Sequence, residues 1–386
     1  MEQLLLEVVL GGEKDNSLKR AEMFGLNLLD EQEKKVALQR NNAQDSWKLE
    51  LKEAIKTYSD LEKVLGQKLP KTTYPIFIPK NFAKKILRAG DKSPLWKQFV
   101  PHSEENKKAG MKDPIGDKNH SKPGKIIHRY KNRLLFFPTP VCPITCRYCF
   151  RKNELANPSE LFDGQLKEAI NYLNNHPEVN EVILSGGDPL ILSDEKLELL
   201  FKEFSKIPSI KYLRIHTRTP IILPSRVTKE LCELLTKYKK KFFSLIIAVH
   251  ANHTDELDDE VRASLIKIKQ TGIKLLSQSV LLKDINDDLT SLKNLFTNLS
   301  DLGITPYYLH HPDRVKGGMH FYLSLTEGRY LYHLLRNELP GWMIPKYVID
   351  IPGGEGKTSA FNPESFDFDG SLINKDGQSI SIDPLQ

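Results

Sequence analysis

The chain has 386 residues, of which 39% are hydrophobic and 27% charged, and its formal net charge is +6 from 56 basic and 50 acidic residues. This composition is typical of a soluble globular protein that is long enough for one large domain and a smaller one. It does not show the concentrated basic stripe of a nucleic-acid-binding protein, and the lysine-rich stretch from Lys107 to Lys125 is better explained as a polar linker.

The compartment is indicated by the N-terminus and by cysteine use. The start M-E-Q-L-L-L-E-V-V-L is interrupted by Glu2 and Glu7 and lacks a basic region, so we expect no secretory signal. No apolar run approaches the roughly 20 residues that cross a bilayer. Clustered thiols fit a reducing compartment. We therefore expect a cytoplasmic protein that binds neither membrane nor nucleic acid.

The first part of the chain, residues 1–125, is expected to be helical, with loops and no strand alternation. The segment from Trp47 to Leu65 has apolar residues at helical spacing and predicts a helix. Proline-containing stretches at 70–79 and 114–123 mark breaks between elements.

From Arg133 onward, strands are expected to alternate with amphipathic helices. The strands are predicted at Leu134–Phe137, Glu181–Ser185, Tyr212–Thr217, Leu245–His250, Leu275–Leu281 and Tyr307–His311. The helices are predicted at Gln165–Asn175, Asp194–Ser205, Lys229–Tyr238, Asp259–Gln270 and Ser291–Leu302. Repeated βα units imply a parallel sheet, and six units are fewer than the eight of a closed TIM barrel.

The C-terminal part is less regular. V-I-D-I-P-G-G-E-G-K-T predicts a strand that leads into a glycine-rich loop before Lys357, and I-N-K-D-G-Q-S-I-S-I-D predicts a hairpin with an Asp-Gly turn. The loop is not a Walker motif, because Ile351 stands where that motif needs its first glycine. A lysine beside such a loop can form a Schiff base with pyridoxal phosphate, although most lysines are surface charges.

Three of the four cysteines, Cys142, Cys146 and Cys149, lie in C-P-I-T-C-R-Y-C. Three soft thiolates without a fourth suit an iron–sulfur cube with one iron left open for a substrate. A structural zinc site would want a fourth protein ligand, and ordinary reduced thiols in a turn are the remaining alternative. Cys232 lies in a helical pattern, where a buried structural thiol is expected.

The C-x3-C-x2-C spacing, with Tyr148 before the last cysteine, resembles the radical S-adenosylmethionine (SAM) enzymes. That resemblance implies an open six-stranded (β/α)6 partial TIM barrel and a 4Fe-4S cluster whose open iron is chelated by SAM. It also implies a reducing electron donor such as flavodoxin or ferredoxin. One electron from the cluster breaks a C–S bond of SAM and releases a 5′-deoxyadenosyl radical. In such sheets, ligands gather at the carboxyl ends of the strands.

The segment S-G-G-D-P-L ends the second predicted strand. Its glycines let the backbone approach a ligand closely. Radical SAM enzymes use a similar segment to bind the methionyl amine, so the resemblance implies a cofactor-binding role for Ser185, Gly186, Gly187 and Asp188. The alternative is a simple turn before a helix that is capped by Ser193.

A wider resemblance, to the lysine 2,3-aminomutases, covers most of residues 45–365. It is carried in order by H-R-Y-K-N-R-L-L, C-x3-C-R-Y-C-F-R, S-G-G-D-P-L, R-T-P-I-I-L-P-S-R, Q-S-V-L-L, P-Y-Y-L-H-H-P-D and V-I-D-I-P-G-G-E-G-K-T, and D-P-I-G-D is also similar. The resemblance implies that Lys357 holds pyridoxal 5′-phosphate (PLP) covalently. It also implies that Arg129, Tyr130 and Arg133 bind this cofactor, because guanidinium groups suit phosphate. Surface charges on an edge strand are the alternative for this segment.

The same resemblance implies the substrate contacts. Arg151 would hold the substrate carboxylate, and Asp313 with Asp350 would hold the ε-ammonium group of lysine. Arginine could pair with the same two carboxylates, whereas a glutamate-using relative would be expected to replace them. Gln278 and His250 are expected at strand ends near SAM, although His250 could equally be structural.

Two features separate the chain from typical free-lysine enzymes. Glu355 in the glycine loop and the segment Y-L-H-H-P-D-R-V-K-G are similar to shorter relatives that serve elongation factor P β-lysylation, whereas Asp350 and the long N-terminal region favour free lysine.

We therefore expect an isomerase that interconverts L-lysine and β-lysine and forms a homo-oligomer. Its expected parts are an N-terminal helical region (1–125), a radical SAM barrel (126–325) and a PLP-binding extension (326–386). A related radical SAM and PLP aminomutase that acts on arginine or glutamate, or that serves elongation factor P β-lysylation, is the main alternative. A nucleic-acid-modifying cluster protein without PLP is a further one.

Overall fold

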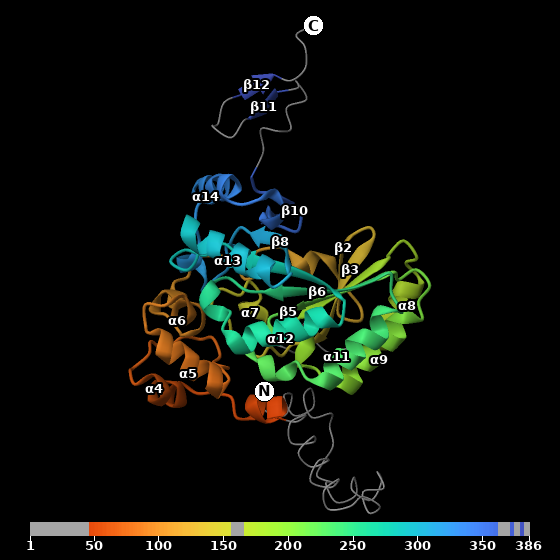
Figure 1. The fold of residues 1–386 in the computed structure, drawn as a ribbon, viewed down its shortest axis with the longest axis horizontal. Coiled ribbons are helices and arrows are strands. Elements are labelled where there is room, and N and C mark those ends of the chain that lie inside the picture. Colours follow the sequence, from red (N-terminus) through yellow and green to blue (C-terminus); the bar gives the residue numbers. More distant parts are fainter. Residues whose placement is uncertain (1–45, 156–165, 362–370, 374–378, 382–386) are drawn as a thin grey trace, which may run out of the picture.

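The computed structural model describes residues 46–155, 166–361, 371–373 and 379–381 (Figure 1). Within these residues a mixed sheet forms the centre of the molecule, and its strands neighbour one another in chain order. They are β1 (Ser121–Lys122), β2 (Ile126–Tyr130), β3 (Arg133–Thr139), β4 (Glu181–Gly186), β5 (Tyr212–Thr217), β6 (Ser244–His250), β7 (Lys274–Val280), β8 (Thr305–His310), β9 (Lys346–Ile351) and β10 (Gly356–Ser359).

The sheet is a curled half-barrel, and it is wider than expected. All six predicted strands are present as β3 to β8 and run parallel, which confirms the α/β class. The parallel run continues into β9, and β2 and β10 add antiparallel partners at the two edges. The sheet therefore has more strands than the six predicted, because the segment V-I-D-I was assigned to a C-terminal extension and not to the sheet.

Amphipathic helices connect the parallel strands and cover the outer face of the sheet (Figure 1). Five of them begin at a side-chain cap, in which Ser193, Thr228, Asp258, Asp288 or Ser324 accepts a backbone N–H of the first turn. The helices are α8 (Leu166–Asn174), α9 (Asp194–Ser205), α11 (Lys229–Lys239), α12 (Asp259–Gln270), α13 (Leu289–Asp301) and α14 (Leu325–Glu338), with the short α7 (Lys152–Leu155) and α10 (Thr219–Ile222) between them.

The hydrophobic core lies between this helical layer and the sheet. Leu184, Ile215 and Ile247 on the strands are completely buried, as are Phe201 and Leu265 on the helices. Each such side chain stabilises the fold by about 1.5–3 kcal/mol relative to exposure. Because the helices fill the outer face, the inner face of the curled sheet is left for a cavity.

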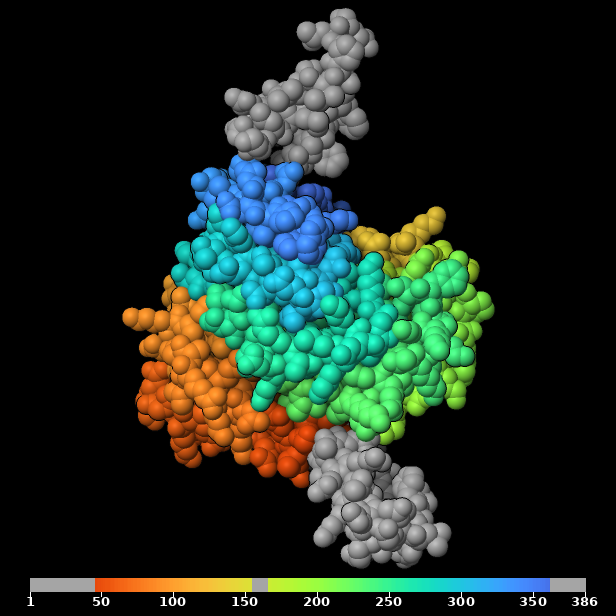
Figure 2. Space-filling view, in the orientation of Figure 1, coloured from red at the N-terminus to blue at the C-terminus, as the bar shows by residue number. Residues whose placement is uncertain are grey.

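The N-terminal part packs beside the barrel as α4 (Tyr58–Leu65), α5 (Lys80–Ala89) and α6 (Pro94–Phe99), and Figure 2 shows it in orange on a different side from the blue C-terminal part. The helix predicted from Trp47 to Leu65 is interrupted. Residues 46–52 are helical, but Ile55 then pairs with Ile78 in an isolated bridge. Thr57 caps α4 afresh by accepting the backbone N–H of Asp60, so local capping and a long-range bridge override the helical spacing.

The C-terminal predictions are confirmed where the structure describes them. The strand and glycine loop correspond to β9 and the turn before β10. The hairpin is formed by β11 (Ser371–Ile373) and β12 (Ser379–Ser381), which pair antiparallel, and its Asp-Gly turn lies outside the described residues. No helix in the described ranges is both long and apolar enough to cross a membrane.

Candidate active site

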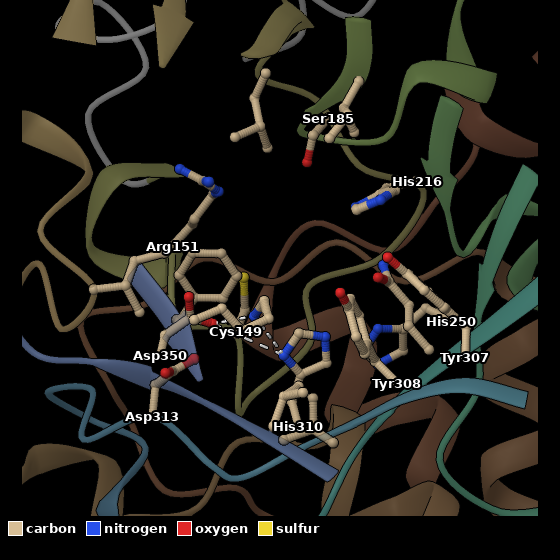
Figure 3. A pocket seen from close by; sticks show the side chains of 18 of the residues that line it. Cys149, Arg151, Ser185, His216, His250, Tyr307, Tyr308, His310, Asp313 and Asp350 are labelled. Atoms are coloured by element: carbon tan, nitrogen blue, oxygen red, sulfur yellow. Dashed lines mark hydrogen bonds and ion pairs between the residues drawn. The ribbon is translucent and has the colours of Figure 1, made fainter. Parts of the chain in front are cut away.

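One cavity of about 1140 Å³ occupies the inner face of the sheet. The carboxyl ends of parallel strands meet at one edge, so residues far apart in the sequence converge there. Every predicted site residue lines this cavity: Arg129, Tyr130, Arg133, Cys142, Cys146, Tyr148, Cys149, Arg151, Ser185, Gly186, Gly187, Asp188, His250, Gln278, Asp313, Asp350 and Lys357. Figure 3 shows Cys149, Arg151, Asp313, Asp350 and His310 around one shared space.

The cysteine loop follows β3 and presents Cys142, Cys146 and Cys149 to the cavity as free thiols. Burial and the neighbouring Cys146 raise the pKa of Cys149 to about 12, and burial raises the pKa of Cys142 strongly. Three thiolates here therefore require a positive centre between them, which a cluster of iron ions supplies. In the described part of the chain, no three His, Cys, Asp or Glu side chains converge on a single metal ion.

Tyr148 and His250 form the wall next to the cysteine loop. The Tyr148 hydroxyl is 2.8 Å from His250 Nε2, and the two rings stack with centroids 5.8 Å apart. Burial holds the pKa of His250 well below its ordinary value, so the imidazole is neutral. Gln278 on β7 is in register with His250 on β6, so both strand ends face the same region.

The two glycines after β4 are required by the backbone. Gly186 has φ of +98°, a conformation that favours glycine. A Cβ on Gly187 would lie 2.3 Å from the Val141 carbonyl oxygen, so only glycine lets the turn approach the cysteine loop this closely. The backbone of the turn is thereby held beside the proposed cluster.

Asp188 has a structural function in this turn. Its buried carboxylate accepts hydrogen bonds from the Thr217 hydroxyl at 2.6 Å and from the backbone N–H groups of residues 190, 218 and 219. These four bonds occupy the carboxylate and join the ends of β4 and β5. Ser193 caps α9, as the alternative interpretation expected.

Arg129 and Arg151 are buried and share one carboxylate that the predictions did not include. Asp117 Oδ1 accepts from Arg129 Nη2 at 2.9 Å, and Asp117 Oδ2 lies 2.6 Å from Arg151 Nη2. Arg129 also lies 3.6 Å from Asp350. Arg129 is therefore not a surface charge. Asp117 belongs to D-P-I-G-D, a segment whose similarity to the aminomutases was noted in the sequence but to which no function was assigned.

Lys357 is held from three sides. It lies opposite Asp350 in the β9–β10 register and pairs with that carboxylate, while its Nζ lies 3.2 Å from His310 Nδ1. Its backbone N–H donates to the Tyr130 hydroxyl at 2.8 Å, and the Arg133 guanidinium stacks 3.9 Å above the Tyr130 ring. An amine with its acceptor, a phenol and a guanidinium group thus line the same cavity, which fits a phosphate-bearing aldehyde such as PLP.

His310 is a second residue that the predictions missed. Burial and the adjacent Lys357 hold the pKa of His310 well below its ordinary value, so the imidazole is neutral and can accept a hydrogen bond from the lysine ammonium. His216, at the end of β5, also lines the cavity as a buried neutral imidazole. Both histidines lie at the carboxyl ends of predicted strands, and this position could have indicated from the sequence that they line the site.

Asp313 follows β8 and completes an acidic end of the cavity. Burial, and then the nearby Asp350, raise the pKa of Asp313 to about 7, although Lys357 acts in the opposite direction. Two neighbouring carboxylates in a buried site disfavour each other's charge. An incoming cation would relieve that repulsion, which makes this end selective for a positive group.

Comparisons with known proteins indicate the family of the chain. Residues 136–293 match the Radical SAM superfamily, which implies a 4Fe-4S cluster and SAM as cofactors. A solved structure of Streptococcus suis SuiB bound to its precursor peptide SuiA aligns with a TM-score of 0.42 at 19% identity over 57% of this chain and 48% of that one.

Curated relatives define the family more narrowly. The L-lysine 2,3-aminomutase of Buchnera aphidicola is 36% identical over 330 residues, which cover 82% of this chain and 96% of the relative. The enzyme of the same name from Escherichia coli K12 is 35% identical over 299 residues, covering 77% and 86%. The chain belongs to the L-lysine 2,3-aminomutase family, as the motifs predicted, and PLP is its third cofactor.

Proposed function

We propose that the chain is an L-lysine 2,3-aminomutase, an isomerase that interconverts L-lysine and β-lysine by moving the amino group from C2 to C3. The observation that carries this proposal is the single cavity into which the cysteine loop, the Arg151 guanidinium, the acidic pair and Lys357 all open. A radical-generating centre and an amine-binding centre can act on one small amino acid only if they share one space.

Each cofactor has residues suited to hold it. Cys142, Cys146 and Cys149 would bind the cluster, and the Gly186–Gly187 backbone would contact SAM, with His250, Tyr148, Gln278 and Ser185 around it. The cluster and SAM supply a radical that removes a hydrogen atom from the substrate. PLP supplies a carbonyl carbon that carries the migrating amino group.

PLP would be held by Lys357, and Arg133 and Tyr130 lie where they can orient it. Arg129 would act partly through Asp350, with which it forms an ion pair. Asp188 would contribute by fixing the glycine turn, since its own oxygens are occupied. The protein's part is to bind, orient and exclude water around the reacting atoms.

The two ends of the cavity match the two charged ends of lysine. Arg151 lines the cavity, and its guanidinium group suits a carboxylate. Asp313 and Asp350 together suit the ε-ammonium group. His310 and Asp350 both contact the Lys357 Nζ, so they would stabilise this amine whenever it is not bound to PLP.

Arginine is the alternative substrate that the acidic pair also fits, because a guanidinium can pair with two carboxylates. Glutamate would place a third carboxylate against Asp313 and Asp350, so we do not expect turnover of glutamate. An aminomutase that serves elongation factor P β-lysylation is the related alternative. The test is anaerobic incubation of reconstituted enzyme with each candidate, SAM and a reductant, followed by chromatographic identification of β-amino acids. β-Lysine alone is the expected product, and exclusive formation of β-arginine or β-glutamate would overturn the proposal.

We further propose the three-part division into residues 1–125, 126–325 and 326–386. The proposal also includes reduction by flavodoxin or ferredoxin, a homo-oligomeric state and a cytoplasmic location. The location follows from the clustered thiolate ligands, which need a reducing compartment. Size-exclusion chromatography with light scattering, and reduction assays with purified flavodoxin and ferredoxin, test the assembly and the donor separately.

A further inference from the structure

We propose that Asp117 is a positioning residue that fixes Arg151 for the α-carboxylate of the substrate. This inference rests on the proposed function and extends it to a carboxylate that no motif had assigned. Asp117 begins the short helix η3 (Asp117–His120), in the N-terminal part of the chain, and it reaches the cavity from outside the barrel strands.

The first support is the shared ion pair. Asp117 lies between Arg129 and Arg151, with oxygen–nitrogen distances of 2.9 and 2.6 Å. The three side chains are only 4%, 8% and 5% exposed, respectively, so water screens the interaction little. A buried guanidinium that is held on one side by a carboxylate keeps its remaining N–H groups in a fixed direction.

The second support is charge. Asp117 is shared between two guanidinium groups, so it neutralises only part of the Arg151 charge, and a substrate carboxylate would complete that neutralisation. Arg151 Nη1 makes no hydrogen bond, and its nearest anionic partner is Glu154 at 3.6 Å. Burial raises the pKa of Glu154 to about 7, so this competitor is only partly ionised. Arg151 lines the cavity, and of its two neighbouring carboxylates only Asp117 lies within 3 Å of its guanidinium group.

The third support is how firmly Asp117 is held. The Asp113 carboxylate accepts the backbone N–H groups of Asp117 and Lys118, each at 3.1 Å. Gly116, just before the helix, has φ of +67°, and a Cβ there would lie 2.4 Å from the Gly354 nitrogen. The turn therefore has one conformation, and Asp117 cannot move independently of the neighbouring loop.

That neighbouring loop is the one that leads to Lys357. Asn119 Nδ2 donates to the Gly353 carbonyl at 3.1 Å, and His120 Nε2 lies 2.9 Å from the Gly354 carbonyl. The segment 113–120 thus contacts the glycine loop and both arginines at once. Asp117 thereby sets the distance between the group that binds the carboxylate and the lysine that binds the amine.

The experiment compares Asp117→Asn with Asp113→Asn in the reconstituted enzyme. Asp113 is the matched control, because it supports the same turn without touching an arginine. Two ligands are titrated against the absorption band of bound PLP: L-lysine, and L-lysinamide, which keeps both amines but lacks the carboxylate charge. Iron and PLP content report whether each variant folds, and Asp117→Glu, which keeps the charge, provides the second variant.

We expect Asp117→Asn to raise KM for lysine about 10-fold or more with kcat changed by less than about threefold, which corresponds to losing a charged hydrogen bond. Its affinity for lysinamide should stay at the wild-type value, and Asp117→Glu should recover part of the loss. Asp113→Asn should affect both ligands equally. Equal losses for both ligands in Asp117→Asn, or an unchanged KM, would overturn the inference. Failure of the wild-type enzyme to convert lysine would instead contradict the proposed function.

Discussion

Asp313 gives the most quantitative test of the substrate-binding end. In the substrate-free protein its pKa is raised to about 7, by burial first and by Asp350 second. A bound ε-ammonium would favour the ionised form and lower that pKa. Lysine binding is therefore coupled to loss of a proton from Asp313, and affinity should fall as the pH drops below 7.

The size of the effect follows from the pKa. A carboxyl with a pKa of about 7 is roughly 90% ionised at pH 8 and roughly 10% ionised at pH 6, so KM for lysine should rise about 10-fold between those values. Asp313→Asn removes the titrating group. At pH 8 it should weaken the free energy of lysine binding by about 1.5–3 kcal/mol, the value of a charged hydrogen bond, and KM should rise accordingly. It should also abolish this part of the pH dependence.

The assay is anaerobic steady-state turnover from pH 6 to pH 8. The substrate α-amine also titrates, so 2-aminohexanoic acid serves as the control ligand: it shares the α-amine and carboxylate with lysine but has no ε-ammonium. The ratio of its inhibition constant to KM for lysine isolates the contribution of the acidic pair. If that ratio is independent of pH in the wild-type enzyme, or if Asp313→Asn keeps the same pH dependence, the assignment of Asp313 is wrong.

Four further substitutions test the cofactor sites. Lys357→Ala should remove the absorption band of covalently bound PLP and reduce turnover below detection, with iron content unchanged by elemental analysis. Cys149→Ser should lose most of the iron and retain the PLP band, and loss of both together would indicate misfolding. Gly187→Ala should displace the cysteine loop through the 2.3 Å contact with the Val141 carbonyl and weaken SAM binding by calorimetry at least 10-fold, or about 1.4 kcal/mol. His310→Phe removes the hydrogen-bond partner of the Lys357 Nζ and should slow the exchange of Lys357 for lysine about 10-fold in stopped-flow absorbance, and an unchanged rate would exclude a role for this contact.

Much of the fold could be predicted because the spacing of apolar residues along the sequence indicates which side chains are buried. The strands β3 to β8 are short apolar runs between capped amphipathic helices, and all were identified. The interruption after residue 52 could not be predicted, since it depends on a bridge between Ile55 and Ile78 that only tertiary packing creates. β9 was read as part of an extension, because a single strand gives no sign of the sheet that it joins.

The site was predictable to the extent that its residues lie in motifs at strand ends. The positions of Lys357 and Asp350 in the chain also predict a cross-strand pair once β9 and β10 are known to be antiparallel. The role of Asp117 was not predictable, because its partners Arg129 and Arg151 lie 12 and 34 residues away and meet it only through the fold. The hydrogen bonds of the Asp188 carboxylate could not be predicted for the same reason, because three of its four donors lie at the end of β5 or just after it.

The most direct test of the central claim follows the migrating nitrogen. Lysine labelled with 15N at the α-amine and with 13C at C3 is mixed with unlabelled lysine and incubated anaerobically with the reconstituted enzyme, SAM and reductant. We predict β-lysine whose 13C3 signal in NMR is split by a directly bonded 15N, because one cavity holds both centres and the amino group moves within one molecule. β-Lysine without that splitting, or no β-lysine from enzyme that contains both iron and PLP, would contradict the account.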